Sequence, residues 1–344
     1  MKILNIINQG KKATKLYHTP ARYHRILDIM AKLYNYQVVH CYSTEQVKNN
    51  IEGTTCIILG GRSYSYISFW DELVFLNELD IPIVLYCHDS HTPPLCISPE
   101  EIKVDIKVDA LLLSCKELAL DGMQNHKEAS KGKGRFSWEG LEDLPLLWYP
   151  PAVDIYQGTI RDIDIISWGR LSKLYPFRCL VNDYISKQQT SIIEDTKPLL
   201  QYLPVKDKQY ISFRIRQLGQ YRAKRLYNIL IRCKISCTGP SKIKCHGSDR
   251  SGVAVGKYFE NAACGVVSLT PPFTDREELG FVHGENIWFT TPDTWLEDLY
   301  YLLENPDILN TLSINGYKLI EERHTVNIRA KQLYDMLQAV KRRG

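Results

Sequence analysis

Two segments of the sequence place imidazole, carboxylate and basic side chains directly after an apolar run. In IPIVLYCHDSH, His88 and Asp89 follow the run, where an imidazole or a carboxylate can act as a general base or bind a polar ligand. In IISWGRLSK, the corresponding residues are Gly169, Arg170 and Lys173. Arg offers a planar fork of donors and Lys a point charge, so this second segment suits a diphosphate. The alternative for the first segment is a turn without a functional role, and the alternative for the second is a solvated basic loop.

A third segment, SGVAVGKYFENAACG, combines glycines with the expected start of a helix near Lys257. Free N–H groups at a helix start attract anions, which predicts a second part of the same phosphate site. Glu260 lies one turn into this helix and could accept hydrogen bonds from a ribose diol. The alternative for Glu260 is a surface acid that the helix dipole favours. The small residues Ala262, Ala263 and Gly265 indicate close packing of the helix on a sheet.

The elements that must position these segments alternate between strand and helix patterns. Apolar runs at 2–7, 36–42, 55–61, 81–89 and 108–114 alternate with helical spacing at 21–34 and 67–80. The pattern restarts at residue 162, with strands expected at 162–170, 210–216, 234–239, 265–270 and 286–290. Helices are expected at 219–233, 294–305 and 325–340. Continuous apolar strands separated by helices are typical of doubly wound parallel sheets.

We therefore predict an α/β fold with two Rossmann-like, doubly wound domains that face a cleft. A chain of 344 residues is long enough for about two domains. The expected boundaries are 1–155 and 156–325, followed by a C-terminal helix at 326–344 that crosses back to the first domain. Ligands of open α/β sheets lie beyond the carboxyl ends of the strands, and the three segments fall at such ends.

Composition excludes several classes of protein. The chain is 44% hydrophobic and 24% charged, with a net charge of +4, so it is neither disordered nor clearly a nucleic-acid binder. No apolar run reaches the ~18 residues of a membrane span, and the first residues lack a signal-peptide pattern. The ten cysteines form no CxxC motif, so we expect buried thiols and a cytoplasmic location. A metal site at Cys233, Cys237, Cys245 and His246 is the weaker alternative, because the spacing fits no common zinc pattern.

These segments resemble a known family. A strand followed by GRxxK, and then a glycine-containing loop running into KYFENAACG, resembles the donor half of GT-B glycosyltransferases of the group 1 or family 4 type. YPFR, FVHGENIWF, LLENPDIL and GYKLIEERHTVNIRA are most similar to the CgeB-like subgroup of spore-maturation proteins. The resemblance is dense over 162–337 and consists of one motif, IPIVLYCHDSH, in the first half.

The resemblance implies a role for each matching residue. The second domain would bind a nucleotide-sugar donor, for which a UDP-sugar is the favoured candidate. The first domain would face an acceptor of unknown identity. Glu260 would bind the ribose, and His88, with Asp89 beside it, would face the transferred sugar. The donor diphosphate would lie on Gly169, Arg170, Lys173, Val253, Ala254, Val255, Gly256 and Lys257, with Arg178 as a further candidate.

One position departs from the family pattern. Family 4 enzymes usually have a second glutamate eight residues before the first, and this chain has Gly252 there. The contacts to the donor sugar are therefore open. Our candidates for them are Gly10, Asp275, Glu277 and Glu278, and the acids among them could equally be ordinary surface charges.

The implied reaction needs no metal and no cofactor beyond the nucleotide-sugar co-substrate. Basic side chains and a helix start can stabilise the charge that develops on the leaving diphosphate. The letters DID at 162–164 match a metal-binding DxD, but they open a strand, whose alternate residues point to opposite faces. The resemblance implies retention of configuration, while an inverting route would use Asp89 or His88 as the base.

Three alternatives remain beside a hexosyltransferase of this kind. The segment YCHDS is also similar to the phage α-glucosyltransferase, which would make the acceptor a hydroxymethylpyrimidine base of DNA. A sugar-nucleotide epimerase can use the same two-domain fold, and a non-catalytic nucleotide-sugar-binding protein could carry the same donor site. A nicotinamide-dependent dehydrogenase is disfavoured, because KILNIINQGKK has one glycine where the dinucleotide fingerprint needs three.

Overall fold

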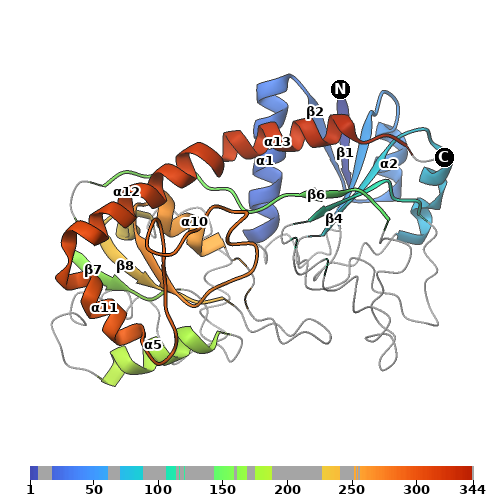
Figure 1. Ribbon diagram of the computed structural model, residues 1–344. Helices are drawn as coiled ribbons and strands as arrows, with labels where there is room; N and C mark the ends of the chain where they lie inside the picture. Colours follow the sequence, from blue (N-terminus) through green and yellow to red (C-terminus); the bar gives the residue numbers. More distant parts are fainter. Residues whose placement is uncertain are drawn as a thin grey trace, which may run out of the picture. The chain divides into compact units, whose positions relative to one another are not determined.

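The computed structural model shows an α/β protein that divides into two compact units (Figure 1). The structure describes residues 1–6, 18–60, 70–87, 106–113, 116, 120, 143–158, 161–168, 175–187, 227–240, 252, 254 and 256–342. The first unit comprises Met1–Pro150, Lys244–Arg250 and Val326–Gly344, and the second comprises Pro151–Ile243 and Ser251–Thr325. Among the described residues, no helix is both long and apolar enough to span a membrane.

The described part of the first unit contains a parallel sheet in the order β2-β1-β3-β4-β5-β6. Its strands are β1 (Lys2–Ile6), β2 (Gln37–Cys41), β3 (Cys56–Gly60), β4 (Ile83–Cys87), β5 (Ala110–Leu113) and β6 (Leu146–Trp148). The connecting helices are α1 (His18–Tyr34), α2 (Thr44–Asn50) and the 3-10 helix η1 (Trp70–Glu78). The apolar runs of the first half thus form strands where the sequence predicts them.

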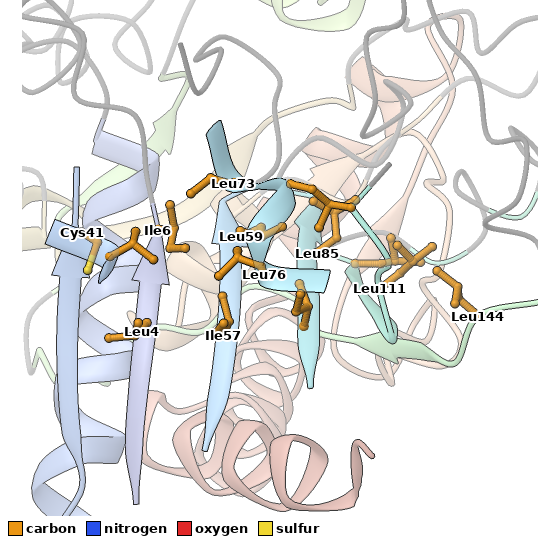
Figure 2. Close-up of a cluster of buried hydrophobic side chains, with 14 residues drawn as sticks. Leu4, Ile6, Cys41, Ile57, Leu59, Leu73, Leu76, Leu85, Leu111 and Leu144 are labelled. Carbon is orange, nitrogen blue, oxygen red and sulfur yellow. The ribbon is translucent and has the colours of Figure 1, made fainter. Parts of the chain in front are cut away.

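The core of the first unit lies between the sheet and its helices. Figure 2 shows Leu4, Ile57 and Leu85 on neighbouring strands, with Leu73 and Leu76 of η1 packed over them. All five side chains are fully buried. Parallel sheets are covered on both faces, so their strands are apolar on both faces, which is why these runs do not alternate with polar residues.

The C-terminal helix α13 (Val326–Ala339) belongs to the first unit and lies beside α1 (Figure 1). The ring of Tyr334 stacks on that of Tyr34, with 4.0 Å between centroids and 12° between planes. The amide Nε2 of Gln338 donates to the Tyr36 hydroxyl at 2.6 Å. Beyond the helix, Arg342 Nη1 donates to Asp109 Oδ2 at 2.8 Å. The chain that leaves the second unit therefore ends on the first.

The second unit has a parallel sheet in the order β10-β9-β8-β7 among its described residues. The strands are β7 (Ile163–Ile166), β8 (Cys233–Cys237), β9 (Val267–Thr270) and β10 (Trp288–Phe289). The helices whose full extent lies in the described residues are α5 (Pro176–Lys187), α10 (Gly256–Ala263), α11 (Trp295–Glu304) and α12 (Pro306–Arg323), and residues 227–230, within the helix expected at 219–233, are also helical. The strands expected at 162–170, 234–239, 265–270 and 286–290 are confirmed, and the one expected at 210–216 lies outside the described residues.

The two faces of this second sheet differ in chemistry. One face packs Ile165, Ile235 and Leu269 against α5 and α11, where Trp295 and Leu299 of α11 are buried in the core. On α10, Asn261 Nδ2 donates to Ser268 Oγ of β9 at 2.9 Å, and Thr270 Oγ1 donates to the Tyr258 hydroxyl at 3.2 Å. These polar contacts seat the helix that carries Glu260.

The acids of the DID segment pair with basic residues of β8 and its approach. Both Nε and Nη2 of Arg232 donate to the carboxylate of Asp162, and this hydrogen bond lowers the pKa of Asp162. Lys234 Nζ donates to Asp164 Oδ1. The two acids therefore join adjacent strands, in keeping with the structural interpretation of this segment.

Candidate nucleotide-binding site

Segments that the sequence singles out meet at the carboxyl ends of β8 and β9. Gly252 O accepts hydrogen bonds from Thr274 N at 2.6 Å and from Thr274 Oγ1 at 2.9 Å. A Cβ on Gly252 would lie 3.2 Å from Phe273 Cα and 3.3 Å from Pro240 Cβ. Pro240 follows β8 and Phe273 follows β9, so Gly252 ties the loop before α10 to both strand ends.

The backbone at Gly252 explains the departure from the family pattern. Its φ is +123°, a conformation that residues with a Cβ rarely adopt. Together with the crowding by Phe273 and Pro240, this leaves no room for a glutamate side chain on the observed backbone. The residue at this position has a structural task, and any contact to a donor sugar must come from elsewhere.

The first turn of α10 adjoins the end of β7. Lys257 Nζ lies 4.0 Å from the centroid of the Trp168 ring, close enough for a cation–π interaction. Trp168 Nε1 donates to Asn261 Oδ1 of α10 at 3.1 Å. Trp168 directly precedes Gly169, so one indole links the predicted basic loop to the helix start. Ala254, Gly256 and Lys257 are half-buried, and Val253 and Val255 lie outside the described residues.

Glu260 is buried, with 4% of its surface exposed. The hydroxyl of Tyr227 donates to Glu260 Oε1 at 3.4 Å. The ring of Tyr227 is in turn stacked on Tyr156, with 4.0 Å between centroids. The alternative of a surface acid is therefore wrong, while the ribose role stays a prediction. An ionised carboxylate can accept several hydrogen bonds, so Glu260 has the chemistry for a diol.

The three acids of the loop after β9, which are equivalent candidates in the sequence, differ in their exposure to solvent. Asp275 is 1% exposed and has a φ of +59°, which is uncommon for a residue other than glycine. Its carbonyl accepts from Leu279 N at 2.9 Å and so begins a turn. Glu277 and Glu278 are exposed. Of the three, only Asp275 is held inside the unit, next to the Thr274 contact with Gly252.

Arg178 is a buried cation at the same edge of the sheet. It is 2% exposed, and its Nη2 donates to Gly239 O, just after β8, at 3.0 Å. Its guanidinium carbon lies 3.7 Å from the centroid of the Tyr175 ring. Burial lowers the pKa of Arg178 from its usual high value. Arg178 therefore fixes the start of α5 against the end of β8.

Part of the predicted site lies outside the described residues. The residues concerned are Gly10, His88, Asp89, Gly169, Arg170, Lys173, Val253 and Val255, all outside the described ranges. Within those ranges, no cluster of three or more His, Cys, Asp or Glu side chains could hold a metal ion. Two residues of the alternative metal site, Cys233 and Cys237, are buried on β8. Burial raises the pKa of the Cys233 thiol to about 12. Cys245 and His246 lie outside the description.

Comparison with known proteins shows which fold this chain shares. The fold is the two-unit GT-B architecture of glycosyltransferases, shared over nearly the whole chain with solved structures. The Anabaena protein HepE in complex with UDP matches with 13% identity and a TM-score of 0.54, over 99% of this chain and 100% of that one. An α-glucosyltransferase in complex with UDP and a 13-mer DNA containing an HMU base matches with 11% identity and a TM-score of 0.60, over 98% and 99%.

A third structure, a glycosyltransferase from Rickettsia africae, matches with 9% identity and a TM-score of 0.51, over 98% of this chain and 97% of that one. More particularly, residues 202–335 match the family described as glycosyl transferase-like. No curated protein matches the sequence significantly. The matched range contains α10 and the loop after β9, whereas Tyr156, Trp168 and Arg178 lie before it.

Proposed function

We propose that this protein is a glycosyltransferase that moves a sugar from a UDP-sugar to an acceptor hydroxyl. The observation that carries the proposal is Glu260, a buried carboxylate one turn inside α10, in a domain of glycosyl transferase-like sequence. A helix start and Lys257 beside it suit the diphosphate of the same ligand. The proteins of similar fold that were solved with UDP favour uridine as the base.

The proposed reaction breaks the bond between the anomeric carbon and the diphosphate oxygen, and the electron pair leaves with UDP. The acceptor oxygen forms the new bond on the face that the diphosphate vacates, which retains the configuration. The acceptor proton passes to the departing phosphate oxygen. The amides at the start of α10, Lys257 and the predicted Arg170 and Lys173 would stabilise the leaving charge without a metal. His88 would contact the sugar from the first unit.

A second candidate acceptor is a modified base of DNA. The supporting observation is the TM-score of 0.60 to an α-glucosyltransferase whose structure contains UDP and DNA with an HMU base. The net charge of +4 adds little to this candidate. Membership of the CgeB-like subgroup and a cytoplasmic location, which would keep the buried thiols reduced, are further parts of the proposal.

Calorimetric titration with UDP, ADP and GDP tests the donor site. We expect UDP to bind, and Glu260→Gln to weaken it by about tenfold or more, because a hydrogen bond to a charged group contributes roughly 1.5–3 kcal/mol. Glu304→Gln, which changes an exposed acid at the end of α11 in the same unit, is the matched control and should leave UDP affinity unchanged.

The reaction itself is tested by release of UDP from UDP-sugars, with and without EDTA. Slow hydrolysis that a glycan, a small-molecule alcohol or a hydroxymethylated DNA accelerates would identify the acceptor class. Activity that EDTA abolishes and Mn²⁺ restores would contradict the metal-free site. Wild-type protein that binds none of the three nucleotides would refute the proposal.

A further inference from the structure

One hydrogen bond joins the Glu260 carboxylate to Tyr227, and two further contacts support that tyrosine from outside helix α10. The Tyr227 hydroxyl donates to Glu260 Oε1 at 3.4 Å. The Tyr156 ring stacks on the Tyr227 ring, with 4.0 Å between centroids and 11° between planes. The backbone N–H of Tyr156 donates to Ala263 O, at the end of α10, at 2.9 Å. These contacts start and finish on α10, so they tie both tyrosines to that helix.

Such a chain restricts a side chain that would otherwise have several conformations. Glutamate has three rotatable side-chain bonds, and ordering it has an entropic cost. A phenol hydrogen bond to one carboxylate oxygen favours a single rotamer, and the stacked ring keeps the phenol itself in place. An ionised carboxylate offers about four acceptor positions, so it can accept a bond from Tyr227 together with bonds from other donors, such as a ribose diol.

We infer that Tyr227 is a positioning residue that holds the Glu260 carboxylate where the two ribose hydroxyls of the donor nucleotide meet it, with Tyr156 as its support. The inference rests on the proposed function, because it takes the ligand to be a nucleoside diphosphate. It goes further by assigning the choice between ribose and deoxygenated sugars to a phenol 33 residues away from the carboxylate in sequence.

The test compares the affinities for UDP and for 2′,3′-dideoxy-UDP, measured by calorimetry. The ratio of the two affinities reports the hydroxyl contacts alone, since both ligands share base and diphosphate. We expect the wild-type protein to prefer UDP by about tenfold or more. Tyr227→Phe keeps the ring and its stack, and should lower this preference to about twofold while the affinity for dideoxy-UDP stays unchanged.

A matched control and a second variant separate positioning from stability. Tyr317→Phe removes another hydroxyl of the same unit, one that accepts from Gln157 Nε2 at 3.0 Å, and should keep the full preference. Tyr156→Leu removes the stack and should lower the preference in the same direction as Tyr227→Phe. In a double-mutant cycle, adding Tyr227→Phe to Glu260→Gln should change the ratio no further, because the tyrosine acts through the carboxylate.

The outcomes distinguish the positioning role of Tyr227 from the proposed nucleotide-binding function of the site. If the wild-type protein prefers UDP and Tyr227→Phe retains that preference, the positioning role is wrong and the donor site stands. Equal losses for UDP and dideoxy-UDP would also overturn it, since they indicate a purely structural role. If the wild-type protein binds no nucleoside diphosphate, the proposed function falls, and the positioning role falls with it.

Discussion

Replacing Gly252 by alanine would test how the loop before α10 is held. Gly252 has a φ of +123°, and a Cβ there would lie 3.2 Å from both Phe273 Cα and Pro272 O. Both are backbone atoms, so neither can rotate away. We expect Gly252→Ala to lower the free energy of unfolding by about 2–4 kcal/mol, of which about 1–2 kcal/mol comes from the backbone conformation and the rest from overpacking.

Gly284 is the matched control for this change. It lies in the same unit with a φ of +76°, and a Cβ there would have no atom within 4 Å. Gly284→Ala should therefore cost only the conformational part, about 1–2 kcal/mol. Urea unfolding measures both variants. Gly252→Ala should also weaken UDP binding, because the loop leads into the helix start. Equal costs for the two variants would refute the claim that Gly252 is crowded.

Two further predictions concern the first unit and the thiols. Arg342→Ala should lower the free energy of unfolding by about 3 kcal/mol, because it leaves the fully buried Asp109 carboxylate without its guanidinium partner. Thermal unfolding measures this loss. In the same measurement Lys331→Ala, which breaks an exposed pair with Asp335, should have no detectable effect. Burial raises the pKa of the Cys56, Cys233 and Cys264 thiols to about 12. Their contribution to the free energy of unfolding is therefore complete below about pH 9 and is lost as the pH rises toward 12, which unfolding measured from pH 8 to 11 should show. Iodoacetamide at pH 8 should leave these three cysteines unmodified.

The strands could be predicted from the sequence because burial on both faces leaves an unambiguous pattern. A short, fully apolar run such as Ala110–Leu113, which forms β5, is typical of a buried strand in a parallel sheet. Helical spacing was a less exact guide. The spacing predicts a helix over 67–80, and the structure has the 3-10 helix Trp70–Glu78 there, whose apolar side chains Leu73 and Leu76 still reach the core.

The candidate site was predictable only where local signals exist. A helix start after glycines marks the region of Lys257 and Glu260, but no local feature shows that Glu260 is buried. That depends on Tyr227 and Tyr156, which are distant in sequence and carry no motif. The acids of the loop after β9 likewise look equivalent in sequence. They differ because a turn begins at Asp275, which places that residue inward and leaves its neighbours in solvent.

The way α10 is seated on its sheet bears on what the site can do. Apolar contacts are non-directional and tolerate small shifts, whereas hydrogen bonds act over a narrow range of distance and angle. The bonds from Asn261 to Ser268 and from Trp168 to Asn261 therefore fix the position of α10 along the strands as well as its distance from them. Buried polar contacts add less stability than an apolar interface of equal area, because each must first lose its water. A helix that carries the proposed ribose-binding carboxylate would gain from this arrangement, since a shift of about 1 Å in a positioned group can weaken its action severely.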